Sequence, residues 1–395
     1  MACLNPVRTL KDDTSRLPNS FLHPRLNAPN SSFRPYPRPV SVTSELVMLA
    51  QRRPSLDALI NANPRKQEVL PAIELSLTNC LSETDLHLSV PGLKSKVRGK
   101  VRDIYDSGDY LVIVTTDRQS AFDRILASIP FKGQVLNQTS LWWFDKTRHI
   151  TSNAVVASPD KNVTLAKKCT VFPVEFVVRG FVTGSTDTSL WTVYQKGLRN
   201  YCGNALPDGL EKNQRLSANI LTPTTKAAVH DVPISPQQIV ERGLMTQDEY
   251  DEVSTKALGL FEYGQRVASE HGLILVDTKY EFGKAPDGSI LLIDEMHTPD
   301  SSRYWVAHSY DRRLQDGLEP ENVDKEFLRL WFKEHSNPYE DEVLPDAPLE
   351  LVTELAWRYI FLYETITNRE FEIPVTQESI HDRISANVAS CLASL

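Results

Sequence analysis

A strand-like segment in the second half of the chain combines an apolar start with charged side chains at every second position. It runs from Leu273 to Gly283 and reads Leu-Ile-Leu-Val-Asp-Thr-Lys-Tyr-Glu-Phe-Gly. Successive side chains of a strand point to opposite faces, so Asp277, Lys279 and Glu281 share one face and the residues between them share the other. Three charged groups on one face of so apolar a strand predict the wall of a cleft.

A turn and a second strand follow this segment. Pro286-Asp287-Gly288 is a strong turn signal, and the mostly apolar run Ser289–Ile293 ends at Asp294. If the turn centres on its last two residues, Glu281 lies directly opposite Asp294. Facing carboxylates repel each other, so the pair indicates a cation between them, and carboxylates with substrate phosphates suit Mg²⁺. The alternatives are a one-residue shift in register, or a solvated edge where the charges do not meet.

A third strand-like segment predicts an anion site. Val174–Arg179 alternates, which places Glu175 and Arg179 on one face. Ser185 is positioned to cap a helix over 190–194, whose first amides and Arg179 would together bind a phosphate. Gly-Ser before a helix is more commonly a cap without a ligand, so this pattern alone is weak.

Further basic and polar residues are weaker candidates. Gly99–Arg102 has the composition of a phosphate grip but is not a Walker A loop, and a solvated basic strand end is the alternative. Lys226, His230 and Asp231 lie in a loop rich in Pro and Thr, a type of segment that often carries function. His230 alone would more often be structural. Arg303 adds a cation shortly after the carboxylate hairpin.

The coarse order of elements predicts an α+β fold. Residues 100–105 and 110–114 read as a hairpin around a turn cluster, and 171–179 reads as another strand. Two helix starts and one helical apolar stripe follow, at Ser235, Thr246 and residues 349–366. Strands precede helices without regular βαβ alternation, which favours α+β over a doubly wound sheet.

Composition excludes several classes of protein. The net charge of −8 argues against a general nucleic-acid binder. No apolar run approaches the roughly 20 residues that span a membrane. The five cysteines are scattered without a C-x-x-C pair, which indicates neither a disulfide framework nor a zinc site.

The first part of the chain has the composition of a targeting segment. Residues 1–60 hold eight Lys and Arg against four Asp and Glu, are rich in Ser, Asn and Pro, and lack a long apolar run. This pattern predicts a transit peptide rather than a secretory signal. We expect import into the chloroplast stroma. The alternatives are import into the mitochondrion and a disordered tail with no targeting role. The transit peptide and disordered leader are expected to span residues 1–75.

Taken together, these segments resemble the SAICAR synthetase family. Val174–Arg179 with its preceding proline and the following Thr-Gly-Ser resembles one family signature, and Val276–Gly283 resembles the other. Three further segments resemble the family in the family's order: 99–105, 117–123 and 294–303. The resemblance runs from about residue 90 to the C-terminus, and the stretch 205–245 resembles the longer forms of the family.

The resemblance implies an ATP-dependent ligase of purine biosynthesis. Such an enzyme joins L-aspartate to the carboxylate of carboxyaminoimidazole ribonucleotide (CAIR), through an acyl phosphate, and yields SAICAR, ADP and phosphate with Mg²⁺. Phosphoryl transfer depends mainly on positioning and on cations around the transferred group, which agrees with the carboxylates and lysines above. The implied fold is a small antiparallel β lobe, 76–178, over a larger α+β lobe, 179–395, with ATP between them.

The resemblance also implies a role for each candidate residue. ATP contacts are implied for Lys100, Ser120, Asp123 and Glu175. Contacts to the phosphate of CAIR are implied for Arg179, Ser185 and Arg303, and Mg²⁺ contacts for Glu281 and Asp294. Lys279 is implied to neutralise charge near the reacting carboxylate, and Lys226 and Asp231 are implied to approach the imidazole or the aspartate.

Two other classes compete with the ligase. Glu281-Phe282-Gly283 superficially resembles the D-F-G of protein kinases, so a small-molecule kinase is the alternative; the required H-R-D-L-x-x-x-N does not precede it. A non-catalytic descendant would have lost the metal carboxylates or phosphate cations, and this chain retains them. The expected partners are the small-molecule substrates, with neither nucleic acid nor membrane, and a homodimer is left open.

Overall fold

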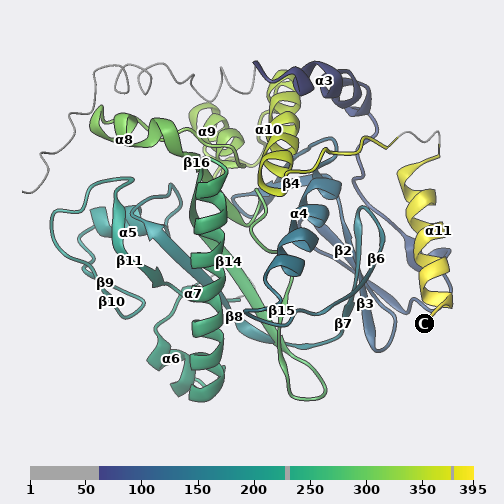
Figure 1. The fold of residues 1–395 in the computed structure, drawn as a ribbon, viewed down its shortest axis with the longest axis horizontal. Helices are drawn as coiled ribbons and strands as arrows, with labels where there is room; N and C mark the ends of the chain where they lie inside the picture. The colour runs from purple at the N-terminus through teal and green to yellow at the C-terminus, as the bar shows by residue number, and fades with distance from the viewer. Residues whose placement is uncertain (1–61, 227–231, 375–377) are drawn as a thin grey trace, which may run out of the picture. The chain divides into compact units, whose positions relative to one another are not determined.

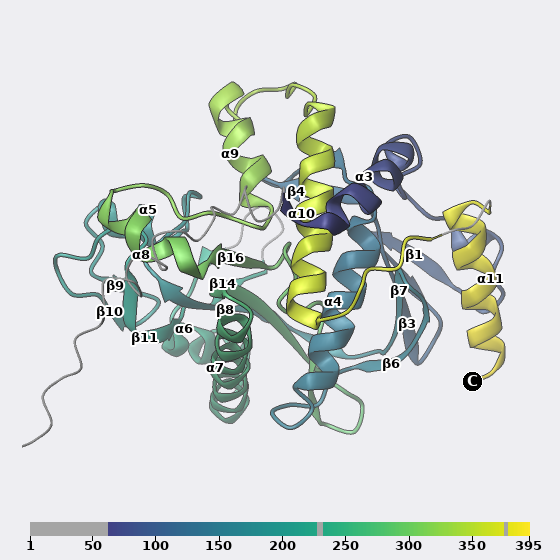
Figure 2. The ribbon, with the colours of Figure 1, turned by 45° about the horizontal axis from the view of Figure 1, so that its top comes forward.

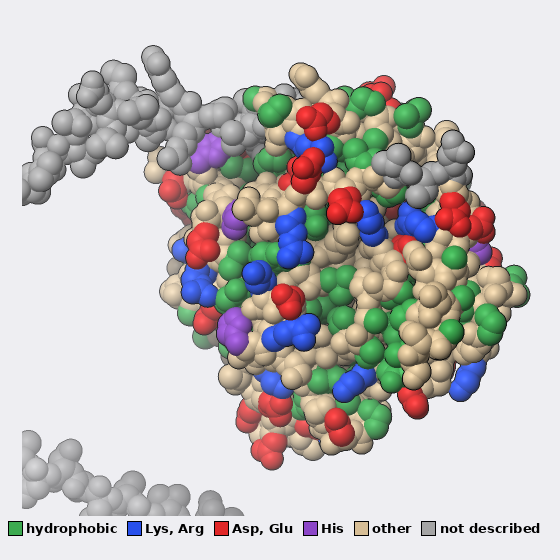
Figure 3. Space-filling model, turned by 45° about the vertical axis from the view of Figure 1, so that its right-hand side comes forward, with side chains coloured by type: hydrophobic (Ala, Val, Ile, Leu, Met, Phe, Trp, Pro, Cys, Tyr) green, Lys and Arg blue, Asp and Glu red, His purple; other side chains and the backbone are tan. Residues whose placement is uncertain are grey.

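The computed structural model describes residues 62–226, 232–374 and 378–395, and it has the predicted α+β fold. The first antiparallel sheet precedes most of the described helices along the chain, whereas the strands of the second sheet are interspersed with helices α5–α7 (Figure 1). No helix in these ranges is long and apolar enough to cross a membrane. On the face drawn in Figure 3, acidic and basic side chains are interspersed rather than gathered by sign.

A five-stranded antiparallel sheet forms the first part of the fold, in the order β1-β2-β3-β7-β6. Its hairpin of β2 and β3 confirms the strands predicted around the turn near Gly108. Apolar side chains of β3 and β7 form a small core with helix α11, which packs on β6 (Figure 1). The bounds are β1 Ser95–Arg98, β2 Arg102–Asp106, β3 Tyr110–Thr115, β6 Val155–Asp160, β7 Val163–Lys167 and α11 Ile380–Ala393.

A seven-stranded sheet follows, with β8 and β14 paired antiparallel at its centre. Phe176, Val178, Tyr280 and Phe282 point from these two strands into the main core, as the alternation predicted. Their neighbours in sequence are therefore directed to the opposite face. The strands are β8 Thr170–Phe181, β11 Arg215–Leu221, β12 Thr224–Thr225, β13 Val232–Pro233, β14 Leu273–Lys284, β15 Ile290–Ile293 and β16 Ser302–Val306.

Helix α7 (Gln247–Glu270) packs along β14 and closes the core side of this sheet. The predicted capping box is present: the Thr246 side chain accepts from the Glu249 amide, and the Glu249 side chain accepts from the Thr246 amide. Val253, Ala257 and Leu260 are fully buried on one face of the helix. The helix gives the cleft-bearing strands a rigid backing.

The remaining elements complete the body around the two sheets. Helices α4 and α10 lie side by side (Figure 2), and the predicted helix starts at Ser235 and near residue 349 are confirmed. Their bounds are α4 Lys132–Lys146, α5 Leu190–Gln195, α6 Pro236–Glu241, α8 Ala307–Gln315, α9 Glu326–His335 and α10 Leu349–Thr367. The short elements are η1 Leu86–Leu88, β4 Arg118–Ala121, β5 Arg124–Ser128, β9 Asn200–Tyr201 and β10 Asn204–Ala205.

One helix corrects the predicted leader of residues 1–75. Helix α3 (Pro64–Ser76) is capped by the Asn63 side chain, packs on α10, and buries Val69 and Ile73 completely in the main core. The predicted disordered leader is therefore wrong for residues 64–75, which form a helix. The prediction relied on the polar composition and overlooked the capping residue and the two apolar side chains four residues apart. Residues 1–61, which carry the rest of that prediction, lie outside the described residues.

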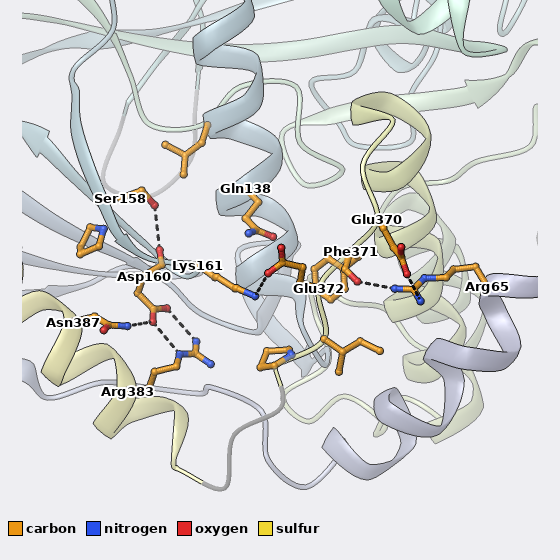
Figure 4. A pocket seen from close by; sticks show the side chains of 14 residues that line it. Arg65, Gln138, Ser158, Asp160, Lys161, Glu370, Phe371, Glu372, Arg383 and Asn387 are labelled. Atoms are coloured by element: carbon orange, nitrogen blue, oxygen red, sulfur yellow. Dashed lines mark hydrogen bonds and ion pairs between the residues drawn. The ribbon is translucent and has the colours of Figure 1, made fainter.

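Arg65 fastens this helix to the segment that follows α10. Its guanidinium pairs with Glu370 at 2.7 Å and donates to the carbonyl oxygen of Phe371 at 2.7 Å (Figure 4). A cavity of about 1060 Å³ lies beside this contact. Its charges neutralise one another, since Arg383 pairs with Asp160 at 2.9 Å, and a further pair is formed by Lys161 and Glu372. We therefore interpret the cavity as a gap between packed helices and strands, with its charges paired, rather than as a charged binding site.

Candidate active site

A second cavity, of about 700 Å³, is a cleft lined by charged groups from both sheets. It brings together nearly all the predicted site residues that the structure describes. These are Lys100, Ser120, Asp123, Glu175, Arg179, Lys226, Lys279, Glu281, Asp294 and Arg303. Ser185 is next to the lining residue Thr186 but does not itself line the cleft. His230 and Asp231 lie outside the described residues.

Lys279 stands at the centre of the acidic part of the cleft. Its ammonium contacts Glu281 directly and lies 3.3 Å from an oxygen of Asp294 and 3.3 Å from an oxygen of Glu175. Lys226 contacts the other oxygen of Glu281. Burial alone would lower the pKa of Lys279, but the three carboxylates raise it well above its usual value. Lys279 is therefore a permanent cation here.

The register of the β14–β15 hairpin corrects the sequence prediction. Glu281 pairs with Ile293, not with Asp294, because the loop has three residues, Pro286–Gly288, rather than two. The Ala285 amide donates to the Ser289 carbonyl at 2.9 Å, and Gly288 takes a positive φ of 86° that closes such a loop. The one-residue shift held open above is thus the actual arrangement.

The two carboxylates nevertheless meet. Asp294 ends the strand with a φ of 64°, and its carboxylate reaches both Lys279 and the guanidinium of Arg102. Arg102 also pairs with Glu295 at 3.0 Å. Burial raises the pKa of Asp294, Arg102 opposes that rise, and the neighbouring carboxylate of Glu281 adds to it. The sequence pattern included Arg102 in a candidate phosphate grip but gave it no role beside these carboxylates.

The donor set of this centre fits Mg²⁺. The described residues contain no group of three or more His, Cys, Asp or Glu placed to hold a metal. Two carboxylates that need phosphate and water to complete the shell match the usual manner of Mg²⁺ binding.

Another part of the cleft holds arginines that face carboxylates. Arg303 contacts Asp277 directly, and Arg179 lies 3.6 Å from the same Asp277 oxygen. Ser185 does not cap α5, which begins after Ser189; the loop is longer than the pattern indicated. Its hydroxyl instead donates to Glu326 at 2.6 Å. Both guanidinium groups are thus held by the carboxylate of Asp277.

The β4–β5 turn carries the remaining candidates. Ser120 is buried on β4, and Asp123 at the turn contacts the ammonium of Lys100. Phe122 and Asp123 both have positive φ, of 53° and 58°, which marks a tight turn at the edge of the cleft. Lys100 remains 58% exposed at the side chain, so a ligand in the cleft can reach it.

An apolar slot of about 200 Å³ was missed by sequence reasoning. It shares Arg102, Lys226, Glu281 and Asp294 with the charged cleft. Its apolar lining includes Ile104, Leu111, Ile113, Leu136, Phe144, Val155, Ala166, Leu292 and Ile293. An apolar strand face looks the same in sequence whether it meets core or a planar ligand, so no local signal distinguished this slot.

Comparison with known proteins decides the family. The sequence model of SAICAR synthetase matches residues 95–345, more than half of the chain. A chloroplastic phosphoribosylaminoimidazole-succinocarboxamide synthase of Arabidopsis thaliana is 68% identical over 401 residues, which cover 99% of this chain and 97% of that protein. The chain belongs to the SAICAR synthetase family. This confirms the predicted ligase of purine biosynthesis and does not favour the small-molecule kinase.

Other members of the SAICAR synthetase family agree in sequence and fold. A Legionella pneumophila (strain Lens) synthase is 59% identical, covering 78% of this chain and 97% of that protein. The Saccharomyces cerevisiae SAICAR synthase complexed with SAICAR is 33% identical with a TM-score of 0.63, covering 74% of this chain and 99% of that one. A SAICAR synthetase in complex with ADP is 26% identical with a TM-score of 0.54, and the match covers 70% of this chain and 100% of that chain. These neighbours confirm the predicted fold class.

Proposed function

We propose that the chain joins L-aspartate to the carboxylate of CAIR and converts ATP to ADP and phosphate. The observation that best supports this is the position of Lys279 between Glu281 and Asp294, in a cleft continuous with an apolar slot and an arginine cluster. A ligase of this kind must bring a nucleotide, a metal ion and a phosphorylated substrate to one point. The relatives solved with SAICAR and with ADP support the same ligands.

The apolar slot is the proposed site of the adenine base. A planar base suits a narrow apolar space, and the shared residues Arg102 and Lys226 lie where the attached phosphates would enter the charged cleft. Lys100, Ser120, Asp123 and Glu175 are the proposed further ATP contacts. The division into a β lobe, 76–178, and an α+β lobe, 179–395, stays a proposal, and its boundary falls within β8, which belongs to the second sheet.

Glu281 and Asp294 would hold Mg²⁺ beside the phosphates, where the ion supplies charge neutralisation for phosphoryl transfer. The carboxylate of CAIR attacks the terminal phosphorus of ATP, and the acyl phosphate forms as ADP departs. The amine of aspartate then attacks the acyl carbon and phosphate leaves. Lys279 and Lys226 already contact the Glu281 carboxylate, so each can stabilise an incoming anion nearby.

Arg179, Arg303 and Ser185 are proposed to bind the ribose phosphate of CAIR. The two arginines now share the Asp277 carboxylate, and Ser185 donates to Glu326. A phosphate with three acceptor oxygens can take over these donors by charge-assisted hydrogen bonds. Asp231 is proposed to approach the imidazole or the aspartate.

The Arabidopsis relative and one from Vigna aconitifolia are named chloroplastic, which supports location of this chain in the chloroplast stroma. The leader composition supports the same location. A reporter fused to residues 1–62 should enter isolated chloroplasts, and a reporter that remains outside them would remove this proposal.

ADP release tests the function directly. A coupled assay should give sustained ADP release only when ATP, CAIR and a nucleophile, L-aspartate in the normal reaction, are all present, and release without CAIR would leave a generic ATPase. Glu281→Gln should lower turnover by at least about 100-fold, since a metal carboxylate and the charge partner of Lys279 are both lost. Its circular dichroism should match the unsubstituted protein. Normal turnover by this variant would refute the metal assignment.

A further inference from the structure

Amide formation, as proposed above, needs a proton acceptor. The α-amine of L-aspartate is largely an ammonium near neutral pH and is not nucleophilic in that form. The nitrogen also carries an extra proton once the new C–N bond has formed. A cleft group with a usable lone pair must therefore take up that proton. The inference that follows rests on the proposed ligase function.

Lys325 is placed to take that proton. It immediately precedes α9, lines the cleft, and its side chain is 19% exposed. Its nearest anion is Asp300, whose oxygen lies 3.7 Å from the ammonium, too far for a hydrogen bond. Among the described residues its ammonium therefore has only a loose ion pair.

A second lysine, Lys132, lies near the other oxygen of the Asp300 carboxylate. Lys132 is fully buried at the start of α4, its ammonium lies 3.6 Å from the other oxygen of Asp300, and it makes no hydrogen bond within the described residues. The amide of Gln119 donates to Asp300 at 3.1 Å, and the Tyr359 hydroxyl donates to Gln119 at 3.0 Å. Asp300 is thus fixed from three sides and shared by two ammonium groups.

The remaining charges around Lys325 are Arg329, which faces it as another cation, and Glu295, which is already paired with Arg102. Burial, assisted by Arg329 and Lys132 and opposed by Asp300 and Glu295, lowers the pKa of Lys325 to about 8. A neutral amine is therefore available to a useful extent at physiological pH.

The other polar groups of the cleft are less suited to this role. Lys279 and Lys226 are each in direct contact with Glu281, so neither ammonium is loosely paired. Asp324 already accepts hydrogen bonds from the backbone amides of Tyr304 and Glu326, at 2.9 and 2.8 Å. Lys325 is distinguished from these groups by its loose pairing.

We propose that Lys325 is the general base for the attacking amine of L-aspartate, and that Lys132 is a positioning residue that acts on it through Asp300. The aspartate ammonium first loses one proton to solvent, and the lone pair of the neutral amine then forms the C–N bond to the acyl carbon. The bond from that carbon to the phosphate oxygen breaks, and phosphate leaves with its electron pair. The surplus proton on nitrogen passes to Nζ of Lys325, which returns it to solvent through the open cleft.

Two nucleophiles separate this step from the phosphoryl transfer before it. Hydroxylamine is already neutral at neutral pH and attacks acyl phosphates without a base, giving a hydroxamate. With CAIR and ATP, Lys325→Met should therefore keep hydroxylamine-dependent ADP release. With L-aspartate, the same variant should lose about 100- to 10,000-fold in kcat at pH 7.5, the usual range for general-base catalysis. Its aspartate rate should rise about tenfold per pH unit, because free amine then becomes limiting.

Two further variants act as controls. Lys325→Arg keeps the positive charge but does not deprotonate, so it should be as slow with aspartate as the methionine variant. Lys196→Met removes an ion pair of the same 3.7 Å length, to Asp187, outside the cleft, and should leave both reactions unchanged.

Lys132 is tested by the pH profile. Its positive charge lowers the pKa of Lys325, so Lys132→Met should move the acidic limb of the aspartate reaction to higher pH and leave the hydroxylamine reaction in place. An unshifted limb in a folded variant would overturn the positioning role.

Three results overturn the role of Lys325: equal loss with both nucleophiles in the methionine variant, no loss with either, or recovery of aspartate turnover in Lys325→Arg. Failure of the ligase proposal looks different, because the unsubstituted protein would then release no CAIR-dependent ADP with either nucleophile.

Discussion

The stability of the fold should depend on helix α3, although the sequence composition predicts a disordered leader at its position. Ile73 is fully buried in the main core, whereas Leu75, two residues later on the same helix, is 81% exposed. Ile73→Ala removes buried carbon atoms from a close-packed site, which typically costs about 2–5 kcal/mol. Leu75→Ala should change the free energy of unfolding by less than about 0.5 kcal/mol.

Chemical unfolding followed by tryptophan fluorescence measures both variants. Trp357 on the neighbouring α10 is fully buried in the same core and reports on this region. We expect a clear fall in the unfolding midpoint for Ile73→Ala and no measurable change for Leu75→Ala. Equal midpoints for the two variants would show that α3 does not belong to the folded body, and the leader would then extend to residue 75 as the composition predicts.

Three further predictions concern the interior. Arg102→Met removes the cation that pairs with buried Glu295 and with half-buried Asp294, which keeps Lys279, so it should destabilise the fold by about 3–5 kcal/mol. The loss should be larger at pH 8 than at pH 5, because burial raises the pKa of Asp294 and a protonated Asp294 needs no cation; urea unfolding at both pH values checks this. Burial lowers the pKa of His297 to about 3, so folding stability should fall by at most about 5 kcal/mol as the pH drops from 6.5 toward 3, and His297→Gln should flatten that decline. Gly264→Ala puts a methyl group 2.3 Å from the buried His297 ring and should cost about 1–3 kcal/mol in thermal unfolding, whereas Gly259→Ala on the same helix, with 3.5 Å of clearance, should not destabilise.

Local patterns predicted most of the frame that carries the cleft. Alternation along residues 174–179 and 279–282 correctly separated the core face from the cleft face, because burial on one side imposes a period of two. The capping box at Thr246 was equally readable, since both hydrogen bonds involve residues three apart in sequence. These features depend on neighbours that the sequence displays.

The features that were missed depend on distant contacts or on loop geometry. Loop length decided the hairpin register, and both lengths fit the same Pro-Asp-Gly signal. Arg102 acquires its partners from residues 294 and 295, almost two hundred positions away. Ser185 likewise meets Glu326 across 141 positions. No local period encodes such pairs, so only the fold brings them together.

The pairing of charges in the cleft suggests how one site accommodates ligands of opposite sign. Lys279 neutralises the two proposed metal carboxylates, and Asp277 neutralises two proposed phosphate-binding arginines. Each such group is only partly exposed and would be costly to leave unpaired. A divalent cation on Glu281 and Asp294 would release Lys279 toward the reacting carboxylate. A phosphate on the arginines would in turn release Asp277. The metal thus frees an ammonium that can pair with the anionic substrates, so the binding of metal, nucleotide and CAIR should be mutually reinforcing.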